Sequence, residues 1–371
     1  SEMCLRDSIY SFIFFCLLLS SCQSLEQLSI DYMIPAEISF PPMLKRVAIV
    51  NNMPDTPNNQ LINPKQDAPK TEREVTRLVQ YYNGNPVLAT ESLAQAIADE
   101  NYFDEVIICD SALRSNDITP RETTLSMEEV DALTRQLKVD FLIAIENIQM
   151  KAIRKIESIS PYNTYLGTTD LAVYPTVRIY VPNRSKPIAS LTPSDSIYWE
   201  NVGIGIEQVR ARLIKDEDLI KEASIFAGTI PVKHLLPYWT TERRYFFTGG
   251  SVNMRDAAIY VKEKNWPGAV ALWEKEYNKK KGKQKMYAAY NLALGYEMQD
   301  SIQSALSWAQ KAQAVAAEID QVEQKKTTRG VDASSVPNYL LTSMYVVELE
   351  KRQASIHMLD MQMGRFRETE K

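Results

Sequence analysis

The carboxy-terminal third of the chain repeats one spacing of small and aromatic residues, and this repeat restricts the fold more than any other feature. From about residue 253 the sequence is rich in Ala, Lys, Glu, Tyr and Trp at helical spacing. Two segments, 254–277 and 287–312, align on Ala257, Tyr260 and Ala269 in the first and on Ala293, Tyr296 and Ala305 in the second. Small residues let two helices approach closely, and aromatic side chains fill the space between neighbouring pairs. We therefore predict an all-α domain of stacked helices over residues 251–371.

This repeat resembles the tetratricopeptide repeat. Ala305 follows Ala269 by 36 residues, close to the tetratricopeptide period of about 34. The pattern departs from that family at Glu276, where a small residue is expected, and both segments lack the closing proline. A third helical segment, 336–363, is expected to cap the stack. The resemblance implies repeat-packing roles for Tyr260, Trp266, Ala269, Tyr296, Ala305 and Ala312. The alternative is a plain helical hairpin in which the spacing is accidental.

Residues 43–250 show the alternating pattern of a layered α/β domain. Strands are expected at 45–52, 103–110 and 141–156, and helices at 86–101 and 126–140. Strands 170–182 and 186–200 are expected to form a hairpin, followed by a helical region over 206–236 and a last strand near 243–250. Ser126 and Glu129 have the spacing of a capping box. This order predicts the α/β or α+β class, with a mixed sheet and helices ahead of the all-α domain.

The element order resembles the periplasmic α/β domains of the TolB amino-terminal, CsgG and LpoB type. The resemblance covers roughly residues 43–248, and it rests on "RVAIVNN", "VDFLIAIENIQ" and the intervening "ESLAQAIADENYFDEVI". These strands carry no chemical signature. The resemblance therefore implies a fold and not an activity.

The amino terminus has the pattern of a secretion signal. Residues 9–19, "IYSFIFFCLLL", form an apolar run that is shorter than the ~20 residues of an ordinary transmembrane helix. The following "LSSC" resembles the lipobox of bacterial lipoproteins, which implies cleavage before Cys22 and attachment of acyl chains such as palmitate there. We accordingly expect a lipoprotein signal peptide over 1–21 and a tether over 22–42. The alternative is a plain secretory signal with an incidental cysteine.

Together, these features make the whole chain resemble an uncharacterised lipoprotein family of Bacteroidota, of the DUF6340 type. The resemblance implies a protein of the bacterial cell envelope that acyl chains anchor in a membrane. No dense acidic cluster follows Cys22, as it does in some surface-exported lipoproteins. We therefore expect an outer-membrane protein that faces the periplasm.

Residue usage argues against several kinds of chemistry. The chain has 12 glycines and 2 histidines, so a glycine-rich phosphate loop and His-based catalysis are not expected. His234 and His357 lack partners at metal-ligand spacing, and Gly203 and Gly205 lack the rest of a phosphate-loop motif. Cys109 lies in an apolar strand and is expected to be a structural, free cysteine. We assign no catalytic, cofactor or metal residues, and the net charge of −5 gives no sign of nucleic-acid binding.

Two functional hypotheses remain open. The first is a non-enzymatic envelope lipoprotein, held to the membrane by its anchor, whose helical repeats bind a protein or peptide. The run "KKKGKQK" at 279–285 is interpreted as a charged loop between repeats. The second is a hydrolase or carbohydrate-active accessory enzyme that uses acidic residues such as Glu146 or Asp170. An enzyme with paired carboxylates needs the two groups about 5–9.5 Å apart.

Overall fold

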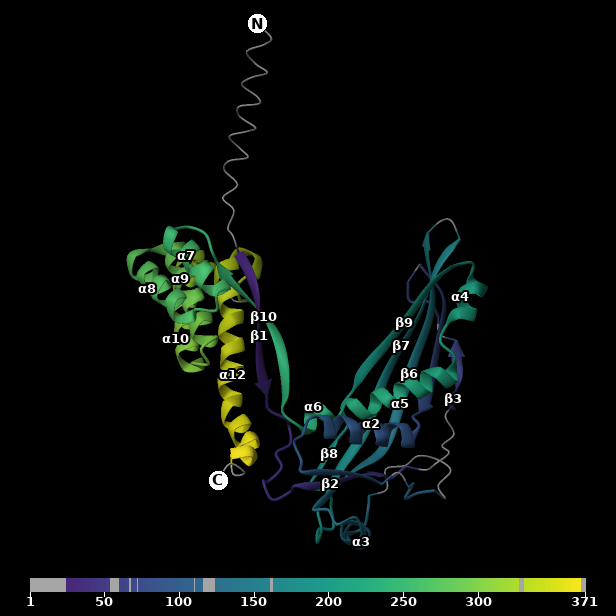
Figure 1. Cartoon of the computed structure of the whole chain (residues 1–371). Coiled ribbons are helices and arrows are strands. Elements are labelled where there is room, and N and C mark those ends of the chain that lie inside the picture. The colour runs from purple at the N-terminus through teal and green to yellow at the C-terminus, as the bar shows by residue number, and fades with distance from the viewer. Residues whose placement is uncertain are drawn as a thin grey trace. The chain divides into compact units, whose positions relative to one another are not determined.

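A computed structural model describes residues 25–53, 60–66, 68–71, 73–109, 111–115, 124–160, 163–326 and 330–367. The chain divides into two compact units. An α/β unit is formed by residues 35–238 and the carboxy-terminal residues from 358 onward, and a helical unit by residues up to 34 together with 239–357. Figure 1 labels most of the elements of both. The predicted fold class, a mixed sheet with helices followed by an all-helical region, is confirmed.

The α/β unit is built on one mixed sheet. Its described strands are β2 (Arg46–Asn51), β3 (Gln60–Gln66), β4 (Glu74–Asn83), β5 (Glu105–Cys109), β6 (Phe141–Ser160), β7 (Thr164–Tyr180), β8 (Ala189–Leu191) and β9 (Asp195–Ile204). Strand β2 runs parallel to β5 on one side and to the start of β6 on the other. All the other pairings are antiparallel, and the long strands β6 and β7 join the two halves of the sheet.

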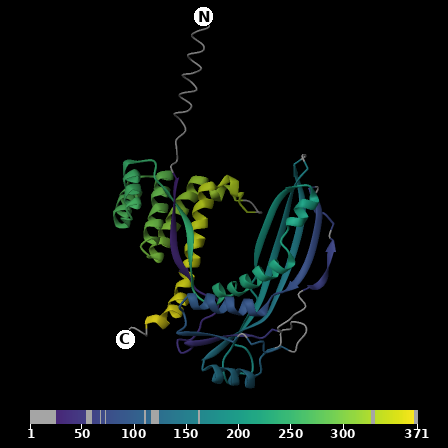
Figure 2. The ribbon, with the colours of Figure 1, turned by 45° about the vertical axis from the view of Figure 1, so that its right-hand side comes forward.

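Helices cover both faces of the parallel part of the sheet. The described helices of this unit are α2 (Pro86–Asp99), α3 (Met127–Leu137), α4 (Ile206–Arg212), α5 (Asp216–Thr229) and α6 (Val232–Leu235), of which α4 packs instead on the antiparallel strands β7 and β9. Helices α2 and α5 lie side by side over one face (Figure 2). Helix α3 packs on the opposite face, where Val130 joins a separate cluster with Leu142 and Ala144 of β6.

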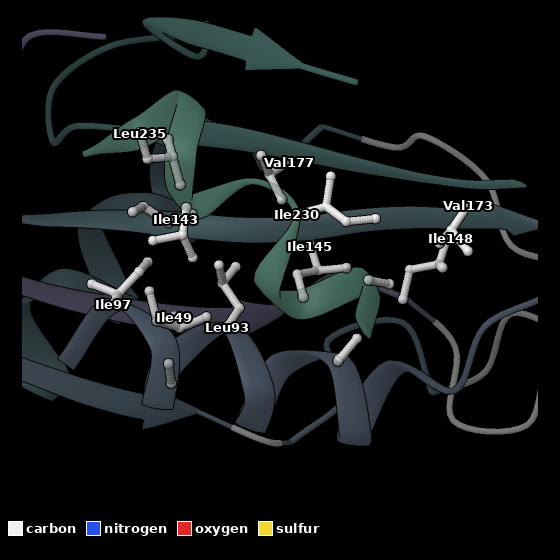
Figure 3. Packing of buried hydrophobic residues seen from close by; sticks show 14 of the residues in the cluster. Ile49, Leu93, Ile97, Ile143, Ile145, Ile148, Val173, Val177, Ile230 and Leu235 are labelled. Carbon is white, nitrogen blue, oxygen red and sulfur yellow. The ribbon is translucent and has the colours of Figure 1, made fainter. Parts of the chain in front are cut away.

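The larger core lies between the sheet and the α2–α5 layer. Ile49 of β2 and Ile143 of β6 face Leu93 and Ile97 of α2 (Figure 3), and all four side chains are fully buried. Removing a buried leucine side chain typically costs about 2–5 kcal/mol. This packing fixes the register of the parallel strands, because a slip of one residue would turn the isoleucines to the other face.

The described part of the helical unit contains a two-stranded sheet of β1 (Leu25–Ile34) and β10 (Tyr238–Phe247). The helices are α7 (Val252–Lys262), α8 (Trp266–Lys279), α9 (Gly282–Glu297), α10 (Ile302–Asp320), α11 (Val322–Lys325) and α12 (Pro337–Arg367), with a short 3₁₀ turn at Ala333–Ser335. Each helix from α7 to α10 contacts the next, and their apolar faces form one cluster around Trp273 and Ala293.

A buried ionic network joins β10, α9 and α12. The fully buried Glu297 accepts hydrogen bonds from Arg244 Nε at 2.9 Å, from Tyr345 Oη at 2.6 Å and from Arg352 Nη1 at 2.9 Å. Asn291 of α9 also pairs with both backbone groups of Phe247. A buried carboxylate is tolerated only with such partners, so strand β10 is bound firmly to the helices.

The boundaries of the units differ from those predicted. The expected tether, 22–42, contains strand β1, and the compact units divide at residues 238 and 239 instead of 250. Helix α12 begins in the helical unit, but its residues from Met358 onward belong to the α/β unit. Strands β3 and β4 were not among the predicted strands. The signal peptide and Cys22 lie outside the described residues.

Candidate functional site

The carboxyl ends of the parallel strands are the natural place to look for a site in the α/β unit. In open α/β sheets, ligands bind beyond these ends, where successive connections leave toward opposite faces. After β5 the chain leads to α3 on one face, whereas α2 covers the other. Asn51 ends strand β2 there and Asn52 follows it, and Glu146 and Asn147 lie beside them on β6, at an irregularity in the pairing with β7.

Glu146 is the central residue of this edge, and its side chain is completely buried. Tyr180 Oη donates a hydrogen bond to Oε1 at 2.7 Å, and Asn52 Nδ2 donates to Oε2 at 2.5 Å. The Arg178 guanidinium lies 3.8 Å from Oε2. Burial raises the pKa of Glu146 above its ordinary value, although the hydrogen bonds from Tyr180 and Asn52 and the charge of Arg178 act in the opposite direction.

The surroundings of Glu146 connect it to helix α3. Tyr180 Oη accepts a hydrogen bond from the backbone N–H of Leu125 at 3.3 Å. Arg114 binds both carboxylate oxygens of Glu129, and Glu129 completes the predicted capping box with Ser126. The Arg114 hydrogen bond lowers the pKa of Glu129. These hydrogen bonds link β6 and β7 to the amino-terminal end of α3, and we call this group of residues the clasp.

Nδ2 of Asn51 and Oδ1 of Asn147 are buried beside Glu146 at this edge and have no hydrogen-bond partner among the described residues. An unpaired buried polar group costs about 1–3 kcal/mol. Such a cost is expected where a site is built to bind a polar group, so this edge is the best candidate for a polar site in the α/β unit.

Asp170, the other carboxylate considered for catalysis, lies elsewhere. It pairs in register with Ile153, seven positions beyond Glu146 on β6. At ~3.3 Å per residue, that places the two backbones roughly 20 Å apart. Asp170 is half-exposed and lies 3.5 Å from Lys155 Nζ. Glu146 and Asp170 therefore do not form a catalytic carboxylate pair.

The residues proposed for repeat packing all lie in the helical unit. Ala269, Ala305 and Ala312 are fully buried in its main cluster. Tyr260, Trp266 and Tyr296 are partly buried and pack against the same cluster. Glu276, which departs from the tetratricopeptide pattern, is also buried. It accepts a hydrogen bond from Asn253 Nδ2 at 3.0 Å and lies 3.7 Å from Lys280 Nζ.

Helix α12 presents a second apolar face that the sequence analysis did not identify. Tyr345, Val346 and Leu349 pack into the helical unit. On the other side, Leu340, Met344 and Val347 are 43%, 58% and 47% exposed. We call Leu340, Met344, Val347, Lys351 and Ala354 the outer stripe of α12; all five are exposed. Because the helix is apolar on two sides, its sequence does not reveal which side is packed.

Other residues considered from the sequence have ordinary structural roles. His234 Nδ1 lies 2.6 Å from Glu37 Oε1, and Cys109 is a half-buried residue of β5. Gly205, with φ of 83°, makes the turn between β9 and α4. In the described part of the chain, no three His, Cys, Asp or Glu residues gather closely enough to hold a metal ion. None of the described helices has the length and apolar character to span a bilayer.

Two models of known protein families match the chain. A family model described as "Domain of unknown function (DUF8603)" matches residues 44–247, more than half of the sequence. The chain belongs to this family. A second model, "Domain of unknown function (DUF6340)", matches residues 255–351 and confirms the DUF6340 part of the expected resemblance. No curated protein and no solved structure matches the chain.

These two matches also clarify the place of strand β10. The DUF8603 match ends at residue 247, at the end of β10, whereas the compact units divide before residue 239. The strand thus belongs to the DUF8603 segment by sequence and to the helical unit by packing.

Proposed function

We propose that this DUF8603 protein is a non-enzymatic lipoprotein of a bacterial cell envelope, anchored through Cys22, whose helical unit binds a helical segment of another protein. The anchor is supported by the apolar run at 9–19 and the "LSSC" tetrad. Acyl chains on Cys22 would keep the protein at the membrane, since each buried CH₂ adds about 0.8 kcal/mol. The outer membrane, facing the periplasm, is the location that we propose.

The observation that carries the binding role is the outer stripe of α12. Its members follow one another at intervals of four, three, four and three residues. This is the spacing with which one helix packs along another in a coiled coil. Large apolar side chains exposed in a row on a soluble protein usually mark an interaction surface, and methionine adapts its shape to a partner.

Charges beside the stripe indicate what kind of helix would fit. Glu348 and Glu350 are both exposed and flank Val347, and Glu348 also pairs with Arg244 of β10 at 2.9 Å. An amphipathic partner helix with basic residues beside its apolar face would complement them. The mode of recognition would be a helix laid along a helix, with anchors at spacings of three and four. The sequence resemblance of α7 to α10 to tetratricopeptide repeats supports this role, because helical repeats commonly present binding surfaces.

The test compares capture of envelope proteins by three anchored chains. We expect the unmodified chain to retain a defined partner and Met344→Glu/Val347→Glu to lose it, because the carboxylates would have to be desolvated at the contact. The matched control is Ile259→Glu, which places a charge at another exposed apolar residue of the same unit, on α7, 55% exposed. If both variants keep the partner, or both lose it equally, the outer stripe is not the binding surface.

The alternative, a carboxylate enzyme, has less support. Glu146 is completely buried, and it is not paired with Asp170. A hydrolase of this kind would need a second carboxylate within about 9.5 Å on a substrate cleft.

A further inference from the structure

A cavity of about 450 Å³ opens in the α/β unit between the sheet and the connection from α4 to α5. This volume lies within the range of about 300–1,000 Å³ that is typical of small-molecule sites. The cavity is separate from the clasp around Glu146. It is lined by Thr76, Arg77 and Leu78 of β4, Arg154 and Ile156 of β6, Arg210 and Ala211 of α4, and Leu213, Ile214, Lys215 and Asp216.

Apolar side chains from both walls form part of the lining. Leu78 and Ile156 come from neighbouring strands, and Leu213 and Ile214 come from the connection that covers them. Leu213 lies against the sheet so closely that a Cβ on Gly167 would come within 3.1 Å of it. A hydrocarbon chain placed here would be removed from water on both sides, which is favourable by about 25 cal/mol per Å².

Arg154 is a preorganised cationic group in the wall. Its side chain is 11% exposed. It donates to Gln80 Oε1, to Tyr82 Oη, to the Ile214 carbonyl at 3.1 Å and to Asp216 Oδ1 at 2.7 Å. Its Nε has no hydrogen-bond partner among the described residues. These bonds hold the guanidinium in one position. The hydrogen bond to Asp216 shows that a carboxylate oxygen can reach the guanidinium from this side.

The charge of the lining favours an anion. It contains four basic residues and one acidic residue. Arg77 has a buried partner in Glu74, and Arg154 has Asp216. Arg210 has only an exposed pair with Glu207, of the kind that contributes little, and Lys215 has no ion pair within the described chain. Arg210 and Lys215 therefore leave positive charge at the cavity that an incoming anion would neutralise.

We propose that this cavity binds a small amphiphile with one anionic head, a carboxylate or a phosphate, on an aliphatic chain. The head lies between Arg210 and Lys215, next to Arg154, and the chain lies on Leu78, Ile156, Leu213 and Ile214. This site is independent of the proposed protein-binding role, since all the residues that form it belong to the α/β unit.

The test uses the chain from residue 23 onward, which contains every described residue, and titration calorimetry below the micellar concentration. The probes are decanoate, decyl phosphate, decanol and decyltrimethylammonium. We expect saturable binding of decanoate or decyl phosphate at one site, with decanol and the cation weaker by about tenfold or more, because decanol brings no opposite charge to the basic groups and the cation is repelled by them. Comparing the two anions separates a carboxylate site from a phosphate site.

Three variants assign the binding to this cavity. Arg210→Glu/Lys215→Glu should weaken binding of the preferred anion by about tenfold or more, because it reverses both exposed charges. Arg212→Glu is the matched control, since Arg212 lies on the same helix but does not line the cavity, and it should leave the affinity unchanged. Ala211→Trp, at an exposed lining residue, should block the site without lowering the midpoint of unfolding.

Several results would overturn the proposal. Equal affinity for decanol and decanoate would show that the head charge is not recognised. An equal loss in Arg212→Glu would show a general effect of surface charge. Full binding in Ala211→Trp, or no saturable binding of either anion to the unmodified chain, would show that the amphiphile does not occupy this cavity.

Discussion

The carboxyl group of Glu146 is enclosed by Tyr180, Asn52 and Arg178, so its ionisation is coupled to folding. Burial raises its pKa above the ordinary value of 4.5. The folded protein therefore binds this proton more tightly than the unfolded chain does. The resulting stability is complete below pH 4.5, and it is lost as the pH rises through the raised pKa. A tenfold difference in proton affinity corresponds to about 1.4 kcal/mol.

Glu146→Gln should remove this dependence, because the amide is neutral at every pH. We predict that the unfolding free energy of the unmodified chain, measured with urea, falls relative to that of Glu146→Gln as the pH rises above 4.5. Glu129→Gln is the control of opposite sign: the pKa of Glu129 is lowered by Arg114, so its stabilising effect is lost as the pH falls. Equal pH profiles for the unmodified chain and Glu146→Gln would contradict the coupling.

From the sequence, Glu146 was named only as an acidic residue that an enzyme could use. Its surroundings were not predictable. Tyr180 lies 34 positions later and Asn52 lies 94 positions earlier. Their meeting depends on the register of β2, β6 and β7, which is set by the packing of whole strands.

At the scale of elements, helices α2 and α5 approach one another closely at Gly228. A Cβ at this position would lie 2.5 Å from the Ala89 carbonyl oxygen and 2.7 Å from the Leu93 nitrogen, both backbone atoms of α2. Backbone cannot move aside as a flexible side chain can. The absence of a side chain at Gly228 therefore permits the layer that covers the sheet.

We predict that Gly228→Ala lowers the unfolding free energy by about 1–3 kcal/mol, the usual cost of overpacking. Gly364→Ala is the matched control. Gly364 is also helical, on α12, and a Cβ there would meet nothing within 4 Å. That substitution should raise the stability by up to about 1 kcal/mol, since alanine favours a helix. Both are measured by urea denaturation, and a neutral Gly228→Ala would disprove the close crossing.

Local signals predicted some element ends and not others. The capping box at Ser126 was predicted because it depends on residues three apart, and the structure contains it. For α2 no capping box was predicted; Asn85 is the N-cap and accepts from the backbone N–H groups of Val87 and Leu88. Strand β4 was missed because it carries buried polar residues, Arg77 and Gln80, at positions where a simple alternating pattern expects apolar ones.

At the scale of the molecule, the two ends of the described chain do not follow the predicted domain order. Strand β1 joins the helical unit because it pairs with β10, more than 200 positions away. The end of α12 joins the α/β unit, where Gln362 bonds to both backbone groups of Ala36 and Arg365 Nη2 donates to the Leu44 carbonyl. Long-range pairings of this kind leave no local signal in a sequence.

A chain that ends at residue 357 should therefore have a less stable α/β unit, even though the predicted α/β domain, 43–250, would be complete. It would leave the Ala36 backbone groups without their partners and Tyr102 without its Arg365 contact. Unpaired buried groups cost about 1–3 kcal/mol each. Hydrogen exchange should show faster exchange of the Ala36 amide. A chain ending at residue 367, after α12, is the control, and equal protection in both chains would contradict the prediction.

Membrane attachment is the property on which the proposed cellular role depends most directly, and Cys22 is the residue that tests it. Cys22→Ala removes the only thiol of the "LSSC" tetrad. We predict that the variant accumulates as an uncleaved precursor or as a form released from the membrane, and that it incorporates no labelled palmitate, because the acyl chains supply the affinity for the bilayer. Cell fractionation, the mobility of the chain on gels and metabolic labelling measure these outcomes. The matched control is Cys109→Ala, since Cys109 lies within strand β5 and outside the tetrad, and its loss should leave labelling and fractionation unchanged. Normal maturation and normal membrane fractionation of Cys22→Ala would show that the protein is not a lipoprotein, whatever its helical unit binds.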